Sequence, residues 1–352
     1  MRRAFSRSIK ALILPAALVF LAAGIAIPAA SAAPIKVVTT LPAYASIAQA
    51  VGGDKVQAAS ISGGSEDAHF VKPKPSYALM LKDANVFVTT GLDLELWAPV
   101  LVDKSGNSRI REGQPGYVNA SQGVPLLEVP TNPSRAAGDI HIYGNPHIHT
   151  SPLNAKIIAG NIAAGLKRVD PANAAYYDTR LAAFRQRLDT ALYGDQLPKI
   201  LGSATLDNLA RQGKLIPFLQ SKDYQGKKLI TQLGGWLGKA LPFRGGKLVT
   251  YHKNWVYFTA LFGLNVVDDV EPKPGIPPSA KHVHELIDEM QAQKIPVVMA
   301  PDYYDPGQVQ AIAQRTGAKA VIVPLGPSGA GADAYFNLID GWVDQLAKAY
   351  AA

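Results

Sequence analysis

Residues 35–61 read IKVVTTLPAYASIAQAVGGDKVQAASI, and this stretch decides the fold. Ile35–Thr40 and Val56–Ile61 are short runs rich in β-branched and apolar residues, which predict two buried strands. Ala43–Val51 is typical of a helix, and Gly52-Gly53 ends it. A strand, a helix and a second strand in close succession predict two parallel strands with the helix against one face of their sheet.

The same alternation continues along the chain. Further strands are predicted at 85–90, 124–129, 247–251, 266–270, 295–300 and 320–323, with helices between most of them. Ala172–Tyr193 is a helical pattern about 30 Å long, which suits either a stiff connector between two lobes or an ordinary surface helix. We therefore predict an α/β protein of two lobes, each a mostly parallel sheet flanked by helices, joined by a long connecting helix.

This reading divides the chain into five parts. They are a signal peptide (1–32), an N-terminal lobe (33–151), connecting helices (152–194), a helical insertion of unassigned purpose (195–245) and a C-terminal lobe (246–352).

The first residues are typical of an export signal. A basic start is followed by the apolar run Ala11–Ile27 and then by Ala30-Ser31-Ala32, a small-residue cleavage site. We predict cleavage after Ala32. An uncleaved membrane anchor is the alternative, although the run is short for a membrane span. Arg2-Arg3 also leaves twin-arginine export open.

Net charge and cysteine content exclude several classes of function. Removing the signal lowers the formal net charge from +8 to +4, because the signal carries four basic residues and no acidic ones. This mild charge does not suggest nucleic-acid binding. The chain has no cysteine, which excludes disulfides, thiolate metal ligands and a lipid-modified cysteine. We expect a periplasmic monomer with no lipid anchor and no membrane insertion after cleavage.

Metal-binding residue types follow several of the predicted strands. His69, His147, His252 and Asp305 are far apart in sequence, and each lies in a loop after a short apolar run. Ligands of open parallel sheets bind at the carboxyl ends of the strands. Three imidazoles and one carboxylate suit zinc. The pattern predicts one metal site in the cleft between the lobes.

Four motifs, in this order, resemble the zinc- and manganese-binding solute receptors of ABC importers. They are SEDAHFVKPKPS at 65–76, GNPHIHTSP at 144–152, KLVTYHKNWVYFTALFGL at 247–264 and PDYYDPGQVQAIAQRTG at 301–317. The resemblance covers most of the chain after the signal. It implies a periplasmic protein, not an enzyme, that captures a divalent metal and presents it to the permease subunits of an importer.

The resemblance also implies which residues bind the metal. His69, His147 and His252 match its nitrogen-ligand positions, and Asp305 matches its acidic position. Histidine at position 252 favours zinc, with manganese as the alternative, because imidazole suits zinc better. Ala68 stands where some zinc receptors have an acidic residue. We expect His141 to be a solvated loop residue, and His149 to lie at the surface although it could reach the same metal.

Two other functions remain open on the sequence alone. A secreted zinc hydrolase would use three histidines with Asp305 or Glu66 as general base, but the chain has no H-E-x-x-H and no G-x-S-x-G motif. An adhesin on the same fold is the third possibility, because a fold does not determine a function.

Overall fold

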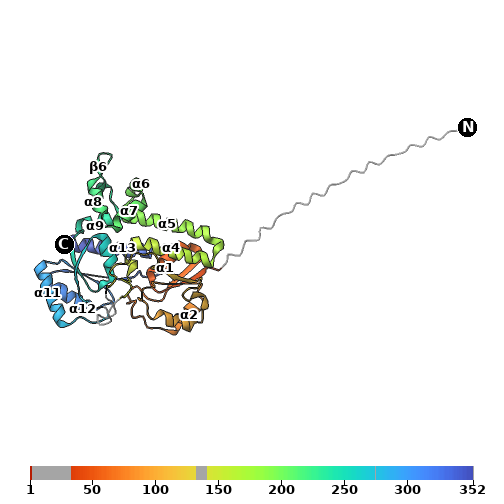
Figure 1. The fold of residues 1–352 in the computed structure, drawn as a ribbon, viewed down its shortest axis with the longest axis horizontal. Helices are drawn as coiled ribbons and strands as arrows, with labels where there is room; N and C mark the ends of the chain where they lie inside the picture. Colours follow the sequence, from red (N-terminus) through yellow and green to blue (C-terminus); the bar gives the residue numbers. More distant parts are fainter. Residues whose placement is uncertain (2–32, 132–140, 274, 352) are drawn as a thin grey trace. The chain divides into compact units, whose positions relative to one another are not determined.

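The computed structural model describes residue 1 and residues 33–131, 141–273 and 275–351 (Figure 1). The predicted signal peptide therefore lies outside the described residues, apart from Met1. From Pro34 onward the chain forms one compact unit. That unit contains two α/β lobes, each built on a parallel sheet, which confirms the predicted fold class. No described helix is both long and apolar enough to cross a membrane.

The N-terminal lobe is built on a four-stranded parallel sheet of order β2-β1-β3-β4. Its strands are β1 (Ile35–Thr39), β2 (Val56–Ser60), β3 (Val86–Thr89) and β4 (Tyr117–Asn119). Its helices are α1 (Pro42–Gly52), α2 (Pro75–Lys82) and α3 (Ala98–Ser105), with short 3-10 turns η1 (Gly53–Lys55) and η2 (Ser108–Ile110). Proline at the first turn of each α-helix supplies a preset φ where no backbone donor is required.

One predicted strand of this lobe is wrong. Residues 124–129 form no strand, and β4 (Tyr117–Asn119) pairs with β3 instead. Pro125 has no N–H to donate to a sheet. The segment bonds to other partners: the Leu127 N–H donates to the Tyr257 hydroxyl at 3.2 Å, and the Leu127 carbonyl accepts from Asn145 N at 2.8 Å. This segment therefore runs beside the C-terminal lobe.

The C-terminal lobe repeats the plan with a parallel sheet of order β10-β9-β7-β8. Its strands are β7 (Lys247–Thr250), β8 (Asn265–Asp269), β9 (Val297–Pro301) and β10 (Lys319–Val323). Its helices are η8 (Lys253–Trp255), α10 (Val256–Phe262), α11 (Ala280–Gln293), α12 (Pro306–Thr316) and α13 (Ala334–Ala351). All five residues of β9 are buried, as expected of a strand covered on both faces.

The lobes are connected by η4 (Ile148–Thr150), α4 (Pro152–Val169), η5 (Pro171–Asn173) and α5 (Ala174–Tyr193). Helix α5 is the predicted long connecting helix and has 20 residues (Figure 1). Its buried side carries Tyr177, Phe184, Leu188 and Leu192, which belong to an apolar core that also includes residues of both sheets. This shared core makes the two lobes one packed body.

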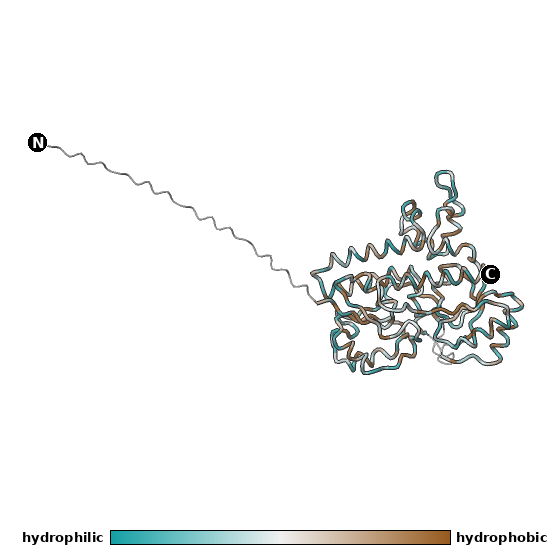
Figure 2. The backbone as a smooth tube through the Cα atoms, turned by 180° about the vertical axis from the view of Figure 1, so that it is seen from behind, coloured by the Kyte–Doolittle hydropathy of each residue, from teal (hydrophilic) through white to brown (hydrophobic). Residues whose placement is uncertain are grey.

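The predicted insertion packs beside α5, and buried residues such as Leu206 and Trp236 belong to the same apolar core as the two lobes. It comprises α6 (Leu197–Leu201), α7 (Ser203–Arg211), α8 (Leu215–Ser221), the hairpin β5 (Asp223–Tyr224) and β6 (Lys227–Lys228), η6 (Leu229–Gln232), α9 (Gly235–Ala240) and η7 (Leu241–Phe243). The hairpin strands are exposed, and the tip of the projecting segment is hydrophilic (Figure 2). Lys156 of α4 anchors the base of the insertion by pairing with Asp189 and with Asp207 at 2.6 Å.

Candidate metal site

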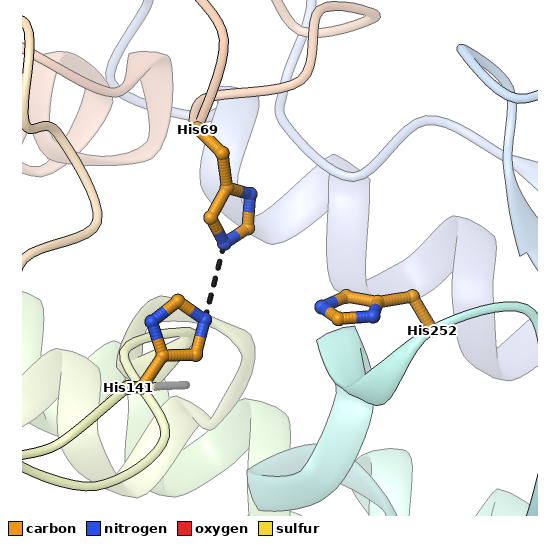
Figure 3. Close-up of side chains that lie close together, drawn as sticks. All are labelled: His69, His141 and His252. Carbon is orange, nitrogen blue, oxygen red and sulfur yellow. Dashed lines mark hydrogen bonds between the residues drawn. The ribbon is translucent and has the colours of Figure 1, made fainter. Parts of the chain in front are cut away.

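Four imidazoles converge between the two lobes. His69 lies on the loop after β2, His141 and His147 on the segment before η4, and His252 two residues after β7. Ligand atoms of His69, His141 and His252 all lie within 4.8 Å of one another (Figure 3). The His147 ring centroid is 5.2 Å from that of His69 and 5.7 Å from that of His252. We call these four residues the imidazole cluster.

The spacing within the cluster suits a tetrahedral metal. The His69 and His141 Nε2 atoms are 3.2 Å apart, and the two rings are stacked. Two nitrogens bound to one tetrahedral zinc at its usual bond length are about 3.3 Å apart. His252 points one ring nitrogen toward the space beside that pair (Figure 3). An ion in this space would be reached from both lobes.

Asp67 fixes the orientation of His69. Its Oδ1 accepts a hydrogen bond from His69 Nδ1 at 2.7 Å and another from the His69 backbone N–H at 3.0 Å. A proton on Nδ1 makes Nε2 an acceptor, and in this structure that nitrogen is hydrogen-bonded to His141 Nε2 at 3.2 Å. Burial alone would raise the pKa of Asp67, but its hydrogen bond to His69 and the charge of that ring outweigh burial and lower the pKa. Trp97 Nε1 donates to the Ala68 carbonyl at 2.7 Å and holds the loop in place.

Asn145 fixes the orientation of His147. Its Oδ1 accepts from the His147 backbone N–H and from His147 Nδ1, both at 3.0 Å. Its Nδ2 donates to the Lys253 carbonyl at 2.9 Å and to Glu128 Oε2 at 3.0 Å. Since backbone N–H groups only donate and carboxylates and carbonyls accept, this amide has one possible orientation.

Glu128 links the two lobes at this point. It adopts a left-handed backbone conformation, with φ of 52°, which is uncommon for a residue other than glycine. Its carboxylate accepts from Asn145 and also from Lys253 Nζ at 2.9 Å. Lys253 directly follows His252, so the Asn145 and Glu128 contacts connect the backbone beside His252 to the side chain that orients His147.

His252 is held mainly by its backbone. Tyr251 N donates to the Met299 carbonyl at 2.8 Å, which extends the sheet pairing to the residue before His252. Asn254 N donates to the His252 carbonyl at 2.7 Å. The ring is 2% exposed, yet its Nδ1 has no hydrogen-bond partner, and Glu271 Oε1 is 3.6 Å from it.

Burial favours the neutral form of three imidazoles of the cluster. Burial, followed by the charge of neighbouring histidines, lowers the pKa of His141 to about 3. Burial likewise lowers the pKa of His252 to about 4, and the His69 ring adds to that effect. His147 is 1% exposed, and burial together with the neighbouring imidazoles lowers its pKa well below the usual value. Neutral imidazole is the form that binds metals.

Asp305, the predicted acidic ligand, lies at the start of a helix. It is exposed at the start of α12, where its Oδ1 accepts from Gly307 N at 2.9 Å as a helix cap. Among the described residues, the group of closely spaced ligand atoms contains His69, His141 and His252, and neither His147 nor Asp305 is part of it. The ligand role of Asp305 thus stays a prediction. Asp302 accepts a hydrogen bond from Ser65 Oγ at 2.6 Å, and Glu66 Oε2 accepts from Gly63 N at 3.0 Å.

Two expectations about the second histidine loop were wrong. His141 is partly buried and stacks on His69 rather than being solvated. His149 is 3% exposed rather than at the surface, and its ring centroid is 6.5 Å from that of His147 and 6.2 Å from that of Tyr44. The sequence feature that could have identified His141 is its position in the same loop as His147 and His149. Asp67 has a clearer signal, a carboxylate two residues before a ligand-type histidine.

Comparison with known proteins decides the family. The family described as "Zinc-uptake complex component A periplasmic" (ZnuA) matches residues 37–192 and 227–349. The chain belongs to this family. The match leaves out 193–226, which is most of the insertion. Membership confirms the predicted resemblance to metal-binding solute receptors of ABC importers.

Relatives and solved structures agree with this assignment. The chain is 26% identical to the iron-binding protein YfeA of Yersinia pestis, over 92% of this chain and 88% of that one. A zinc-bound ZnuA deletion mutant has a similar fold, with a TM-score of 0.66 at 22% identity over 91% of this chain and 99% of that one. The receptor FpvC of Pseudomonas aeruginosa in complex with Mn²⁺ gives a TM-score of 0.64 at 21% identity, over 91% and 99%. These similar proteins thus differ in the metal that is named with them: iron, zinc and manganese.

Proposed function

We propose that this protein captures a zinc ion in the imidazole cluster and delivers it, from the periplasm, to the permease of an ABC importer. The observation that carries the proposal is that histidines of both lobes meet: ligand atoms of His69, His141 and His252 lie within 4.8 Å of one another. The His147 ring lies beside those of His69 and His252. With three of these rings neutral by virtue of burial, the cluster offers nitrogen lone pairs without a charge to remove.

The donor set supports zinc over manganese. All four members of the cluster are imidazoles, and imidazole suits zinc, copper and nickel, whereas manganese prefers carboxylate and water oxygens. Carboxylates do lie nearby, but Asp67 is engaged with the far nitrogen of His69, and Glu271 lies on the Nδ1 side of His252. They act on the ligands rather than on the ion.

Enclosure supports binding rather than hydrolysis. A catalytic zinc has three protein ligands and an open position for water, whereas a closed four-ligand site has none. Four imidazoles from both lobes would fill that position. Glu66, the alternative general base, bonds to the backbone of its own loop through Gly63 N. Transport also requires that the bound metal can be released.

The test is metal binding by protein purified without a histidine tag. We expect one tight zinc site, with manganese bound at least about tenfold more weakly, in competitive titrations. Zinc at 1,000 times its Kd would stabilise the fold by about 4 kcal/mol and raise the melting temperature, and chelator would reverse this.

Two variants make the test specific. The double substitution His69→Ala with His252→Ala should abolish the melting shift. His284→Ala, at an exposed histidine outside the cluster, should leave it unchanged. Absence of binding of any divalent metal by the parent protein would overturn the receptor proposal, and tighter manganese binding would overturn only the choice of zinc. Stimulation of a reconstituted importer's ATPase by zinc-loaded protein tests delivery.

A further inference from the structure

The ring nitrogen of His147 that does not bond to Asn145, Nε2, has a partner of its own in the structure. The Nδ2 atom of Asn254 lies 3.1 Å from His147 Nε2, and both residues are buried. Asn254 belongs to η8 of the C-terminal lobe, two residues after His252, whereas His147 belongs to the N-terminal lobe. A single amide thus connects the two lobes inside the cluster.

The hydrogen-bond network determines which atom donates. Asn145 has one possible orientation, so its Oδ1 must accept from His147 Nδ1. A neutral imidazole has one N–H, and that proton is on Nδ1, so Nε2 is an acceptor. Asn254 must therefore present its NH₂ group to Nε2. Its Oδ1, in consequence, is buried without a partner.

The lone pair that accepts this hydrogen bond is the one that a metal would use. An ion cannot bind His147 Nε2 until the Asn254 amide has moved away from it. The amide has a second partner at hand, because Nδ2 also lies 3.4 Å from the Tyr303 hydroxyl. Displacement therefore costs about one hydrogen bond and does not leave the NH₂ group without a partner.

We propose that Asn254 is an affinity-setting residue: its amide competes with the metal for His147 Nε2, weakens capture, and recovers the nitrogen during release. This inference rests on the proposed function, since it concerns the same site. In this role the amide takes part in metal binding and release. His147 Nε2 bonds either to the amide or to the metal, so it is never a buried acceptor without a partner.

The expected effect is a gain in binding. Asn254→Leu keeps a side chain of similar size but cannot donate, so zinc meets a free Nε2. We expect zinc to bind about 3- to 10-fold more tightly, the range covered by a single neutral hydrogen bond, and to dissociate more slowly by a similar factor. A residue that only filled space would give weaker binding when replaced.

The experiment compares parent and variant by competitive zinc titration and stopped-flow chelator chase. Asn161→Leu is the matched control, because that amide bonds to the Ala120 and Gln122 carbonyls and touches no ligand histidine. It should leave affinity unchanged. In a His147→Ala background Asn254→Leu should have no effect, because the amide acts through His147. If the leucine variant does not fold, Asn254→Ala is measured instead.

A measurement on the metal-free protein tests the hydrogen bond itself. In ¹⁵N spectra, His147 Nε2 of the parent should be unprotonated and hydrogen-bonded, and in Asn254→Leu it should shift to the value of an unbonded acceptor nitrogen. Unchanged or weaker zinc binding by a folded Asn254 variant would overturn this inference alone. If the parent bound no zinc, the proposed function would fail instead, while the spectra would still report whether the bond exists.

Discussion

The two lobes contribute to the imidazole cluster in different ways. In the N-terminal lobe, His69 and His147 each donate their Nδ1 proton to a dedicated acceptor, Asp67 Oδ1 at 2.7 Å and Asn145 Oδ1 at 3.0 Å. In the C-terminal lobe, His252 Nδ1 has no partner and Glu271 is 3.6 Å away. One lobe therefore fixes its ligands through side chains, and the other fixes its ligand through the backbone after β7.

This difference bears on the proposed metal binding. If these histidines bind the ion as proposed, side chains oriented by a hydrogen-bond partner lose less conformational entropy on binding than His252, whose Nδ1 has no partner. The Asn145, Glu128 and Lys253 contacts connect the two sides, so the halves are not independent.

The largest expected effect comes from removing His252, which is the only cluster histidine of the C-terminal lobe. His252→Ala should weaken zinc binding by about 100-fold or more, because losing a ligand costs more than disturbing its supporting partner, which costs about 10- to 100-fold. His149→Ala is the control, since that histidine is equally buried but its ring is 6.5 Å from the His147 ring. It should change affinity by less than about threefold. Competitive titration with folding checked by circular dichroism decides, and a larger loss for His149→Ala would move the site toward that residue.

Low pH should destabilise the metal-free protein because buried histidines such as His252 resist protonation in the folded state. The pKa of His252 is lowered by burial to about 4, whereas an unfolded histidine titrates near 6.5. The unfolded state therefore takes up protons first as pH falls, and stability is full above about pH 6.5 and declines toward pH 4. One such ring costs about 2 kcal/mol by pH 5. Urea unfolding at pH 7.5 and 5 measures this, and His252→Ala should reduce the difference. A pH-independent midpoint would contradict it.

The side-chain support of the N-terminal ligands can be tested separately. Asp67→Asn keeps the shape but removes the charge that orients His69, so zinc affinity should fall about tenfold. Glu66→Gln is the neighbouring control, because that carboxylate bonds only to its own loop. Glu271→Gln is the corresponding change beside His252. A larger loss of zinc affinity in Asp67→Asn than in Glu271→Gln would support the difference between the lobes. Equal losses would remove the proposed difference between the lobes.

The smallest expected effect concerns Asp305. If its carboxylate serves as the cap of α12, Asp305→Ala should lower the free energy of unfolding by about 1 kcal/mol and leave zinc affinity unchanged. Asp305→Ser, which can still cap the helix, should restore most of that stability. A loss of affinity in both variants would show instead that Asp305 reaches the metal.

The prediction from sequence worked best where local chemistry decides structure. The strand, helix and strand at 35–61 are present as β1, α1 and β2, because apolar periodicity and the Gly52-Gly53 stop act over a few residues. The strand predicted at 124–129 is absent, because the apolar run contains Pro125 and bonds to the other lobe. The structure brings the rings of His69, His147 and His252 together, and their role as metal ligands stays a prediction.

The sequence alone was enough to predict the structural elements. These are two α/β lobes, a long connecting helix, and histidines in the loops between strands and helices. Tertiary structure alone decided which loop residues meet. His141 joins the cluster by stacking on His69, 72 positions earlier, and Asp305 caps its own helix. The physical reason is that periodicity and spacing report contacts between near neighbours, whereas the path of a loop depends on distant partners. Asn145, Glu128 and Asn254 are such partners, and they become visible only when the two lobes face each other.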